Sequence, residues 1–132
     1  MDICFSPIGW VRTDVTDDAV PHFYAVSGVE GTLELLPEFA PGLADLKIGQ
    51  QIAVLFHFHR SPPFSKTMLK QVPRKRKEPR GIFSICSPKR PNAIGLSVVD
   101  IISITGRRIG VKGLDMLDGT PILDIKPHSS NK

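Results

Sequence analysis

The 132-residue sequence lacks most of the features that mark membrane, secreted and zinc-binding proteins. No apolar run approaches the roughly 20 residues that a membrane-spanning helix needs. The first ten residues, MDICFSPIGW, contain no basic segment of the kind that opens a signal peptide. The two cysteines, Cys4 and Cys86, form no CxxC pair, which argues against a zinc knuckle or a disulfide scaffold. We therefore expect a reduced, cytoplasmic protein with no membrane association.

The common nucleotide-binding and hydrolase motifs are also missing. Neither the phosphate-binding pattern G-x-x-x-x-G-K-[ST] nor the dinucleotide pattern G-x-G-x-x-G occurs, which removes the ordinary nucleotide-binding folds. The nucleophile pattern G-x-S-x-G is absent too, so no Ser–His–Asp site of familiar form is predicted.

What the sequence does contain is turn residues and short apolar segments. Twelve prolines and eleven glycines favour strands joined by turns over long helices. The predicted strands lie at residues 3–12, 32–35, 52–59, 82–85, 94–99, 98–104, 109–114 and 122–125. A turn or short helix is expected at 37–46 and a short helical turn at 64–72. The chain is thus predicted to be one mainly β domain over residues 1–132, a barrel or a sandwich, with at most one or two short helices.

The strand predicted at 52–59 ends in two histidines. Its apolar face carries alternate residues from Ile52 to Phe58, and its other face ends in His57 and His59. Two histidines at i, i+2 project from the same side, as in a metal-binding His-x-His pair. Such a pair needs further ligands, and only His22 and His128 remain among the histidines. Hydrogen-bonded or solvent-facing histidines are the favoured explanation of the pattern, and a metal site is an open alternative that we do not predict.

Positive charge gathers in one part of the chain. The net charge is only +4, but the segment from Lys66 to Arg90 is opposed by a single acid, Glu78. Its cations are Lys66, Lys70, Arg74, Lys75, Arg76, Lys77, Arg80, Lys89 and Arg90. This asymmetry suggests a polyanionic partner or an anionic small molecule. The alternative is a solvated loop whose charge only aids solubility.

The last of these cations lie in a stiff segment, Ser87–Asn92, which we call the proline loop. Two prolines, two cations and an asparagine are packed into these six residues, between apolar runs at 82–85 and 94–99. Proline fixes φ and has no N–H, so the loop is rigid and well suited to presenting charge to a ligand. A basic turn that simply ends a strand is the plainer interpretation.

Four segments in this order resemble a known family. They are Phe58–Ser61, Gly81–Phe83, the run SPKRPNAIGLS from Ser87 to Ser97, and LDGTPILDIKP from Leu117 to Pro127. The sequence strongly resembles the TsaA-like (YaeB/TrmO) family, whose signature reads RSPxRPNPIGLS followed by LDGTPxLDIKPY. The resemblance extends from about Phe5 to His128.

The resemblance implies a closed β-barrel that binds S-adenosylmethionine, commonly as a homodimer with the cofactor near the interface. The implied activity is methylation of the exocyclic nitrogen of threonylcarbamoyl-adenosine beside the tRNA anticodon. The implied cofactor contacts are His59, Arg60, Cys86, Leu96, Asp118, Gly119, Thr120 and Pro121. The implied contacts to the cofactor carboxylate or to RNA are Lys89 and Arg90, with Arg74, Lys75, Arg76 and Lys77 attracting tRNA without sequence preference. The catalytic residue is not assigned.

The sequence departs from the family pattern at several of these positions. Cys86 stands where the family has an arginine, and Phe23, in the segment Pro21–Phe23, where it has a glutamine. Ala93 replaces a proline and His128 a tyrosine. We also expect no C-terminal domain of the kind that the longer bacterial members carry.

Two other functions are retained as alternatives to the methyltransferase. One is a barrel that binds S-adenosylmethionine or RNA without catalysis, which the changes at Cys86 and Phe23 would permit. The other is a cupin-like metal enzyme that uses His57 and His59. Binding of cofactor with no methylation of tRNA would favour the first, and stoichiometric metal would favour the second.

Overall fold

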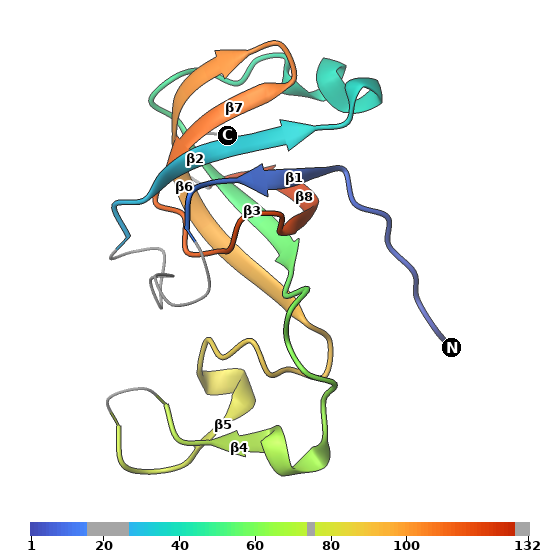
Figure 1. Cartoon of the computed structure of the whole chain (residues 1–132), viewed down its shortest axis with the longest axis vertical. Helices are drawn as coiled ribbons and strands as arrows, with labels where there is room; N and C mark the ends of the chain where they lie inside the picture. The colour runs from blue at the N-terminus through green and yellow to red at the C-terminus, as the bar shows by residue number, and fades with distance from the viewer. Residues whose placement is uncertain (16–26, 74–75, 129–132) are drawn as a thin grey trace.

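The computed structural model describes residues 1–15, 27–73 and 76–128 (Figure 1). Arg74, Lys75 and the segment Pro21–Phe23 lie outside the described residues, as does His22 within that segment. No helix among the described residues is long and apolar enough to cross a membrane.

Six strands form one antiparallel sheet that makes up the upper part of Figure 1. They are β1 (Gly9–Arg12), β2 (Glu30–Leu35), β3 (Gln51–His57), β6 (Ile94–Thr105), β7 (Arg108–Lys112) and β8 (Pro121–Pro127). Their order is β1-β2-β7-β6-β3-β8, and two residue pairs between β1 and β8 close it into a barrel. The mainly β prediction is confirmed.

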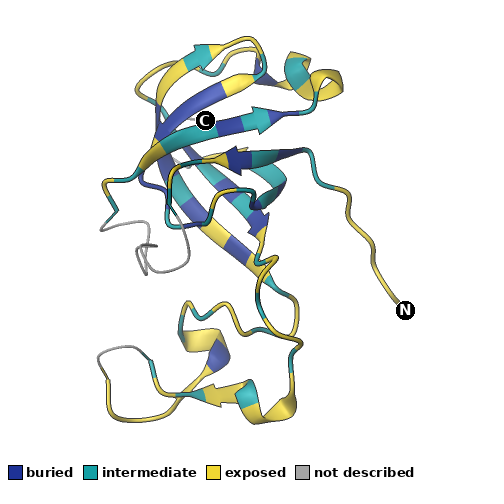
Figure 2. Cartoon of the chain, viewed as in Figure 1, coloured by how far each residue is buried: buried dark blue, intermediate teal, exposed yellow. Residues whose placement is uncertain are grey.

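Alternation of apolar and polar residues determines which side chains fill the barrel. On β3, Ile52, Val54 and Phe56 are at most 2% exposed, and the intervening residues face outward. The first half of β6 points Gly95 and Ser97 inward in the same way. The core also takes side chains from the remaining strands and the loop before β8, and the barrel interior is accordingly dark blue in Figure 2.

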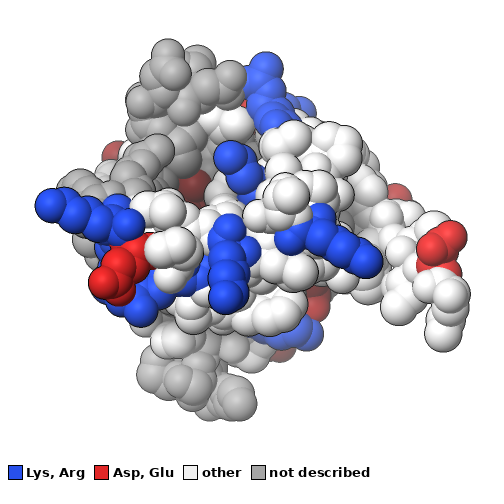
Figure 3. Space-filling view, turned by 90° about the horizontal axis from the view of Figure 1, so that it is seen from below, with Lys and Arg blue, Asp and Glu red and all other residues white. Residues whose placement is uncertain are grey.

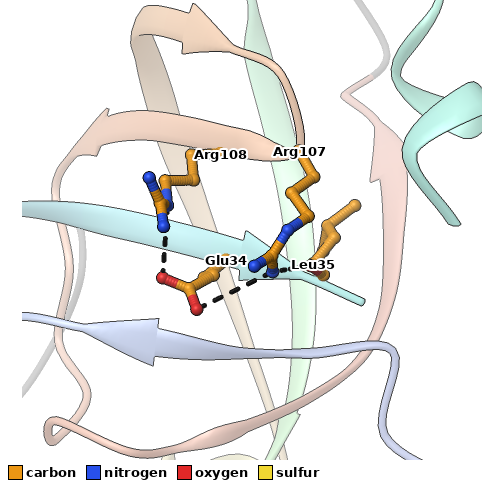
Figure 4. A network of polar contacts seen from close by, with 4 residues as sticks. All are labelled: Glu34, Leu35, Arg107 and Arg108. Atoms are coloured by element: carbon orange, nitrogen blue, oxygen red, sulfur yellow. Dashed lines mark hydrogen bonds and ion pairs between the residues drawn. The ribbon is translucent and has the colours of Figure 1, made fainter. Parts of the chain in front are cut away.

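An ion-pair network joins β2 to the hairpin formed by β6 and β7 (Figure 4). The Glu34 carboxylate lies 3.7 Å from Nη1 of Arg107 and 3.4 Å from Nε of Arg108. Arg107 also donates from Nη1 to the carbonyl of Leu35 at 2.7 Å. Gly106, in the hairpin turn, has φ of +60°, which glycine adopts without strain. The network lies on the barrel and fixes one edge of β2 against the hairpin.

The segment between β3 and β6, residues 58–93, forms a separate lobe below the barrel in Figure 1. It contains η4 (Lys66–Leu69), β4 (Lys70–Gln71), β5 (Arg80–Gly81) and η5 (Ile82–Ser84). β4 and β5 pair with each other, with Lys70 opposite Gly81. Figure 2 shows the lobe mostly exposed, and Ile82 is its one buried residue among those described.

Three of the sequence predictions need correction. A strand was expected at residues 82–85, but the chain forms η5 there, and the Ile85 N–H closes it on the Ile82 carbonyl at 3.3 Å. Of the strand expected at 3–12, only the last four residues form a strand, β1, and residues 1–6 are exposed. The strand expected at 52–59 ends at His57 as β3. The short helices expected at 37–46 and 64–72 are confirmed by the 3-10 helices η3 (Pro37–Leu43) and η4.

Candidate functional site

The register of the sheet brings three of the motif segments to one end of the barrel. His57, the last residue of β3, pairs with Ile94, the first residue of β6. One position earlier, Phe56 pairs with Ile122 of β8. The turn Asp118–Pro121, which leads into β8, therefore lies at this same end. Segments that are far apart in the sequence therefore converge because β6, β3 and β8 are neighbours.

The strand tip, Phe58–Ser61, is bonded directly to the residues around the proline loop. Phe58 donates its N–H to the carbonyl of Ala93 at 2.8 Å, and Ser61 donates its hydroxyl to the carbonyl of Pro88 at 3.0 Å. A turn closed by the Ser61 N–H on the Phe58 carbonyl, at 3.2 Å, contains His59 and Arg60, both exposed. β3 thus ends two residues earlier than expected, and His59 does not continue the strand face of His57.

Side chains of the lobe hold the proline loop in place. Gln71 donates from Nε2 to the carbonyls of Met68 at 2.7 Å and Lys89 at 2.9 Å, and its Oε1 accepts from the Ser87 hydroxyl at 2.6 Å. Arg90 turns back and donates from Nη1 to the carbonyls of Ile85 at 2.8 Å and Ser87 at 3.2 Å. Nη1 of Arg90 therefore bonds the backbone beside and within the loop. The side chain of Lys89 is exposed.

The Asp118 turn, residues 118–121, is attached to the end of β1. Asp118 accepts from the N–H of Thr13 on Oδ1 at 3.0 Å, and Gly119 donates its N–H to the carbonyl of Val11 at 2.8 Å. Gly119 has φ of +81°, which accounts for a glycine here. Thr120 is 2% exposed and donates its hydroxyl to the Leu117 carbonyl at 2.7 Å. The N–H of Thr120 donates to the carbonyl of Leu117 at 3.2 Å, so the backbone itself closes the turn.

A further polar contact links two motif segments inside the barrel. Ser97, which is fully buried on β6, donates its hydroxyl to Oδ1 of Asp115, in the segment that leads to the Asp118 turn. The contact joins the strand that carries Leu96 to the approach of the turn. Sequence reasoning did not single out either residue, because a buried serine becomes visible only once its partner is known.

An open cavity of about 410 Å³ lies at the end of β1, beside the Asp118 turn. Its lining residues are Arg12, Thr13, Asp14, Glu30, Gly31 and Asp118. Of the cofactor contacts implied by the resemblance, it includes Asp118 alone. Leu96 is 53% exposed on the outer surface of β6, and His59, Arg60 and Cys86 are exposed around the strand tip and the lobe. Within one chain, the described residues of the site are thus distributed over one end of the barrel. They do not line one enclosed pocket.

The histidine pair gains no support as a metal site. Over residues 1–15, 27–73 and 76–128, no three His, Cys, Asp or Glu side chains lie together as metal ligands would. His57 lies with Nδ1 3.2 Å from the carbonyl of Ala93, consistent with the simpler interpretation of a hydrogen-bonded histidine. The cupin-like alternative has no observation in its favour here.

Basic side chains cover the lobe end of the molecule. Figure 3 views this end from below, and blue side chains outnumber red ones across it. The described cations of the lobe that are exposed are Arg60, Lys66, Lys70, Arg76, Lys77, Arg80 and Lys89. The described part of the charge predicted from the sequence therefore lies largely on the surface of the lobe.

Comparison with known proteins identifies the family. Residues 16–132 match the model of the tRNA-methyltransferase O N-terminal domain. The chain belongs to this family. The match covers the motif segments that converge at the end of the barrel, including the proline loop and the Asp118 turn.

The chain is similar to proteins of different lengths, of which it covers different shares. A probable S-adenosyl-L-methionine-binding protein of Methanothermobacter thermautotrophicus is 35% identical over 97% of this chain and 91% of that protein. A human tRNA (adenine(37)-N6)-methyltransferase is 41% identical over 65% of this chain but only 20% of its own length. The crystal structure of TrmO from Pseudomonas aeruginosa superposes with a TM-score of 0.76 at 34% identity, over 97% of this chain and 56% of that one. The chain therefore spans about half of the solved structure and most of the archaeal relative.

Proposed function

We propose that this chain binds S-adenosylmethionine and methylates the N6 atom of adenine in tRNA, with threonylcarbamoyl-adenosine as the acceptor. The observation that carries the proposal is membership of the tRNA-methyltransferase O family over residues 16–132, with the motif segments gathered at one end of the barrel. The exposed basic lobe supports a polyanionic substrate. Such a substrate would place the protein in the cytoplasm, and we treat residues 1–132 as one barrel domain.

The residues of the site suit the chemical groups of the cofactor. Asp118 is exposed, and among the described residues its carboxylate takes only the Thr13 N–H on Oδ1, so Oδ2 can accept from ribose hydroxyls or an amino group. Gly119 has open space where a Cβ would stand, so a ligand can approach the turn closely. Arg60 supplies a cation for the cofactor carboxylate, and Leu96 supplies an exposed apolar surface. We assign the contacts accordingly to His59, Arg60, Cys86, Leu96 and residues 118–121.

Cys86 is the position at which this site differs most from the family pattern. Its side chain is exposed and stands where the family has an arginine, so the guanidinium of that position is missing. We propose that Arg60 and Arg90, which flank the same part of the lobe, provide the missing positive charge. Ser61 ties the turn that carries Arg60 to Pro88 of the proline loop, so both cations belong to one hydrogen-bonded unit.

We further propose that two copies associate through the outer face of β3 and β6. Leu96 is paired with Leu55 on this face, and Leu96 and Ile94 are 53% and 39% exposed. A second copy would cover this apolar surface and would bring the spread site residues of two chains together. Sedimentation should give a dimer that Leu96→Glu dissociates. Ile48→Glu, at a loop position that is 68% exposed, is the matched control and should leave the dimer intact.

The chemistry requires alignment more than acid–base catalysis. When bound, S-adenosylmethionine supplies an electrophilic methyl carbon on a positively charged sulfur. The methyl group would pass from that sulfur to adenine N6, with the C–S bond electrons left on sulfur, and the N6 proton would leave to water or to a nearby base. The residues of this chain would hold the two reactants in line and shield the reacting atoms from water. Asp118 and the cations of the strand tip and proline loop are the groups that we expect to position them.

Titration calorimetry with S-adenosylmethionine tests the cofactor assignment. We expect saturable binding. Asp118→Ala should weaken it by about ten-fold or more, because a hydrogen bond donated to a charged acceptor contributes roughly 1.5–3 kcal/mol. Glu38→Ala, which removes an exposed carboxylate in η3, is the control and should bind as the unaltered protein does. No binding at millimolar cofactor would refute the proposal.

A methyl-transfer assay separates the enzyme from its closest alternative. With labelled S-adenosylmethionine and tRNA that lacks the methyl group, we expect label in the adenine N6 position. Cofactor binding without transfer to any tRNA would instead favour a non-catalytic barrel, which the cysteine at position 86 makes a specific alternative.

A further inference from the structure

Phe83 stands out on the surface of the lobe. Its side chain is 79% exposed, the highest value of any large apolar residue among those described apart from Met1. The residue before it, Ile82, is 1% exposed and anchors η5 to the body of the lobe. The helix therefore turns one apolar side chain inward and the next one out into solvent.

The backbone that carries Phe83 is held from both sides. Before it, Gly81 pairs with Lys70 in the two-stranded sheet and accepts the Ser84 hydroxyl on its carbonyl at 2.7 Å. After it, Ile85 donates its N–H to the Ile82 carbonyl at 3.3 Å and accepts from Nη1 of Arg90 at 2.8 Å. A ring on such a backbone loses little conformational freedom when it meets a ligand.

Cations lie close to Phe83 in the sequence and on the two-stranded sheet that precedes it. Arg80 precedes it on β5, Lys70 lies opposite Gly81 on β4, and Arg76 and Lys77 follow β4 in the same lobe. Glu78 is the only acid between residues 58 and 93. Single exposed apolar residues are common and need no special explanation. A rigid exposed aromatic ring within a predominantly basic lobe is a different case, because it combines the two features that bind single-stranded nucleic acid.

We propose that Phe83 is a stacking platform for an unpaired RNA base, with the surrounding lysines and arginines holding the flanking phosphates. Base stacking on an aromatic ring is largely independent of sequence, and the cations add an attraction that salt weakens. The choice of RNA rests on the proposed function, whose acceptor lies beside the anticodon in a single-stranded loop. Phe83 would bind a base there other than the one that receives the methyl group.

Fluorescence anisotropy with a labelled anticodon stem-loop and a labelled oligouridine tests the proposal, in the absence of cofactor. Phe83→Ala should weaken binding of both by about ten-fold or more, because stacking contributes roughly 1–3 kcal/mol per base. The slope of affinity against salt concentration should stay unchanged, since no cation is removed. Phe83→Trp should restore binding, whereas Phe83→Leu, which keeps the apolar surface without the aromatic face, should not.

Two controls make the test specific. Phe5→Ala removes another exposed ring, 69% exposed and outside the lobe, and should bind RNA normally. Arg80→Ala should lower both affinity and salt slope, as expected of a phosphate contact. Equal RNA affinities of Phe83→Ala and the unaltered protein would overturn the proposal, and so would full binding by Phe83→Leu.

The result is independent of catalysis. Loss of RNA binding by Phe83→Ala would support the stacking role even if no cofactor bound, and the methyltransferase proposal would then fail alone. Normal methylation and RNA binding by Phe83→Ala would refute the stacking role and leave the enzyme assignment intact.

Discussion

Replacing Gly95 with alanine would place a methyl group against the ring of Phe56 on the neighbouring strand. The two residues are a cross-strand pair of β6 and β3, and both are buried. A Cβ on Gly95 would lie 2.5 Å from Cε2 and 2.8 Å from Cε1 of the ring, where ordinary contacts are 3.4–4 Å. The ring cannot swing into solvent, because Phe56 is 2% exposed and Phe58 packs edge-on against it at 5.0 Å between centroids.

Overpacking of a buried site costs about 1–3 kcal/mol, and the close approach to a buried ring puts Gly95→Ala near the top of that range. We expect a loss of about 2–3 kcal/mol in the free energy of unfolding, measured by urea denaturation. The melting temperature should fall by roughly 10 °C in a domain of this size. Gly42→Ala is the matched control, because its Cβ would meet nothing within 4 Å, and it should change stability by less than about 0.5 kcal/mol.

A second substitution isolates the contact. In a Phe56→Leu background the clash is relieved, so Gly95→Ala should cost less than about 1 kcal/mol, a coupling of roughly 1–2 kcal/mol. If Gly95→Ala is as stable as the unaltered protein, or costs the same in both backgrounds, the packing explanation is wrong. The glycine of the motif would then need another reason, such as close approach of a ligand.

Two further perturbations follow from the hydrogen bonds and ion pairs. Gln71→Ala removes the two hydrogen bonds that join its side chain to Lys89 and Ser87 of the proline loop, so the amides of Ser87, Lys89 and Arg90 should exchange about ten-fold faster or more while the barrel amides exchange as before. Faster exchange throughout the chain would contradict this. Glu34→Gln should lower unfolding free energy by less than about 1 kcal/mol, because Arg108 is 59% exposed and water screens the pair. Urea denaturation that shows a loss above 2 kcal/mol would mean that the network in Figure 4 is stronger than its exposure implies.

The strands were predictable because alternation is a local property of the sequence. The run from Ile52 to Phe56 identifies β3 and its buried face without any knowledge of its partners. Its end was not predictable, because the strand stops where Phe58 bonds the carbonyl of Ala93, which is 35 positions away in the sequence. Ile82 illustrates the same limit, since one buried side chain is compatible with a strand or with the 3-10 helix that forms.

The candidate site, too, was predictable from the sequence only in part. Motif resemblance predicted Asp118 and the proline loop as site positions, but it did not predict the hydrogen bond from Thr13 that holds the aspartate from 105 positions away. Nor did it show that Leu96 faces outward, because inside and outside on β6 depend on a register that only the paired strand defines. The polar lining of the cavity, such as Arg12 and Glu30, carries no motif at all.

The pairing of His57 with Ile94 makes the lobe a modular insertion. Adjacent antiparallel strands can be joined by a two-residue turn, so residues 58–93 amount to a hairpin loop enlarged into a substructure of its own. An Asn-Gly turn in their place should leave the six strands in register and give a miniature barrel. Barrel assembly and the presentation of a basic surface would then be separable by design, and exchange of the lobe between relatives would test whether it transfers the RNA binding that we propose for it.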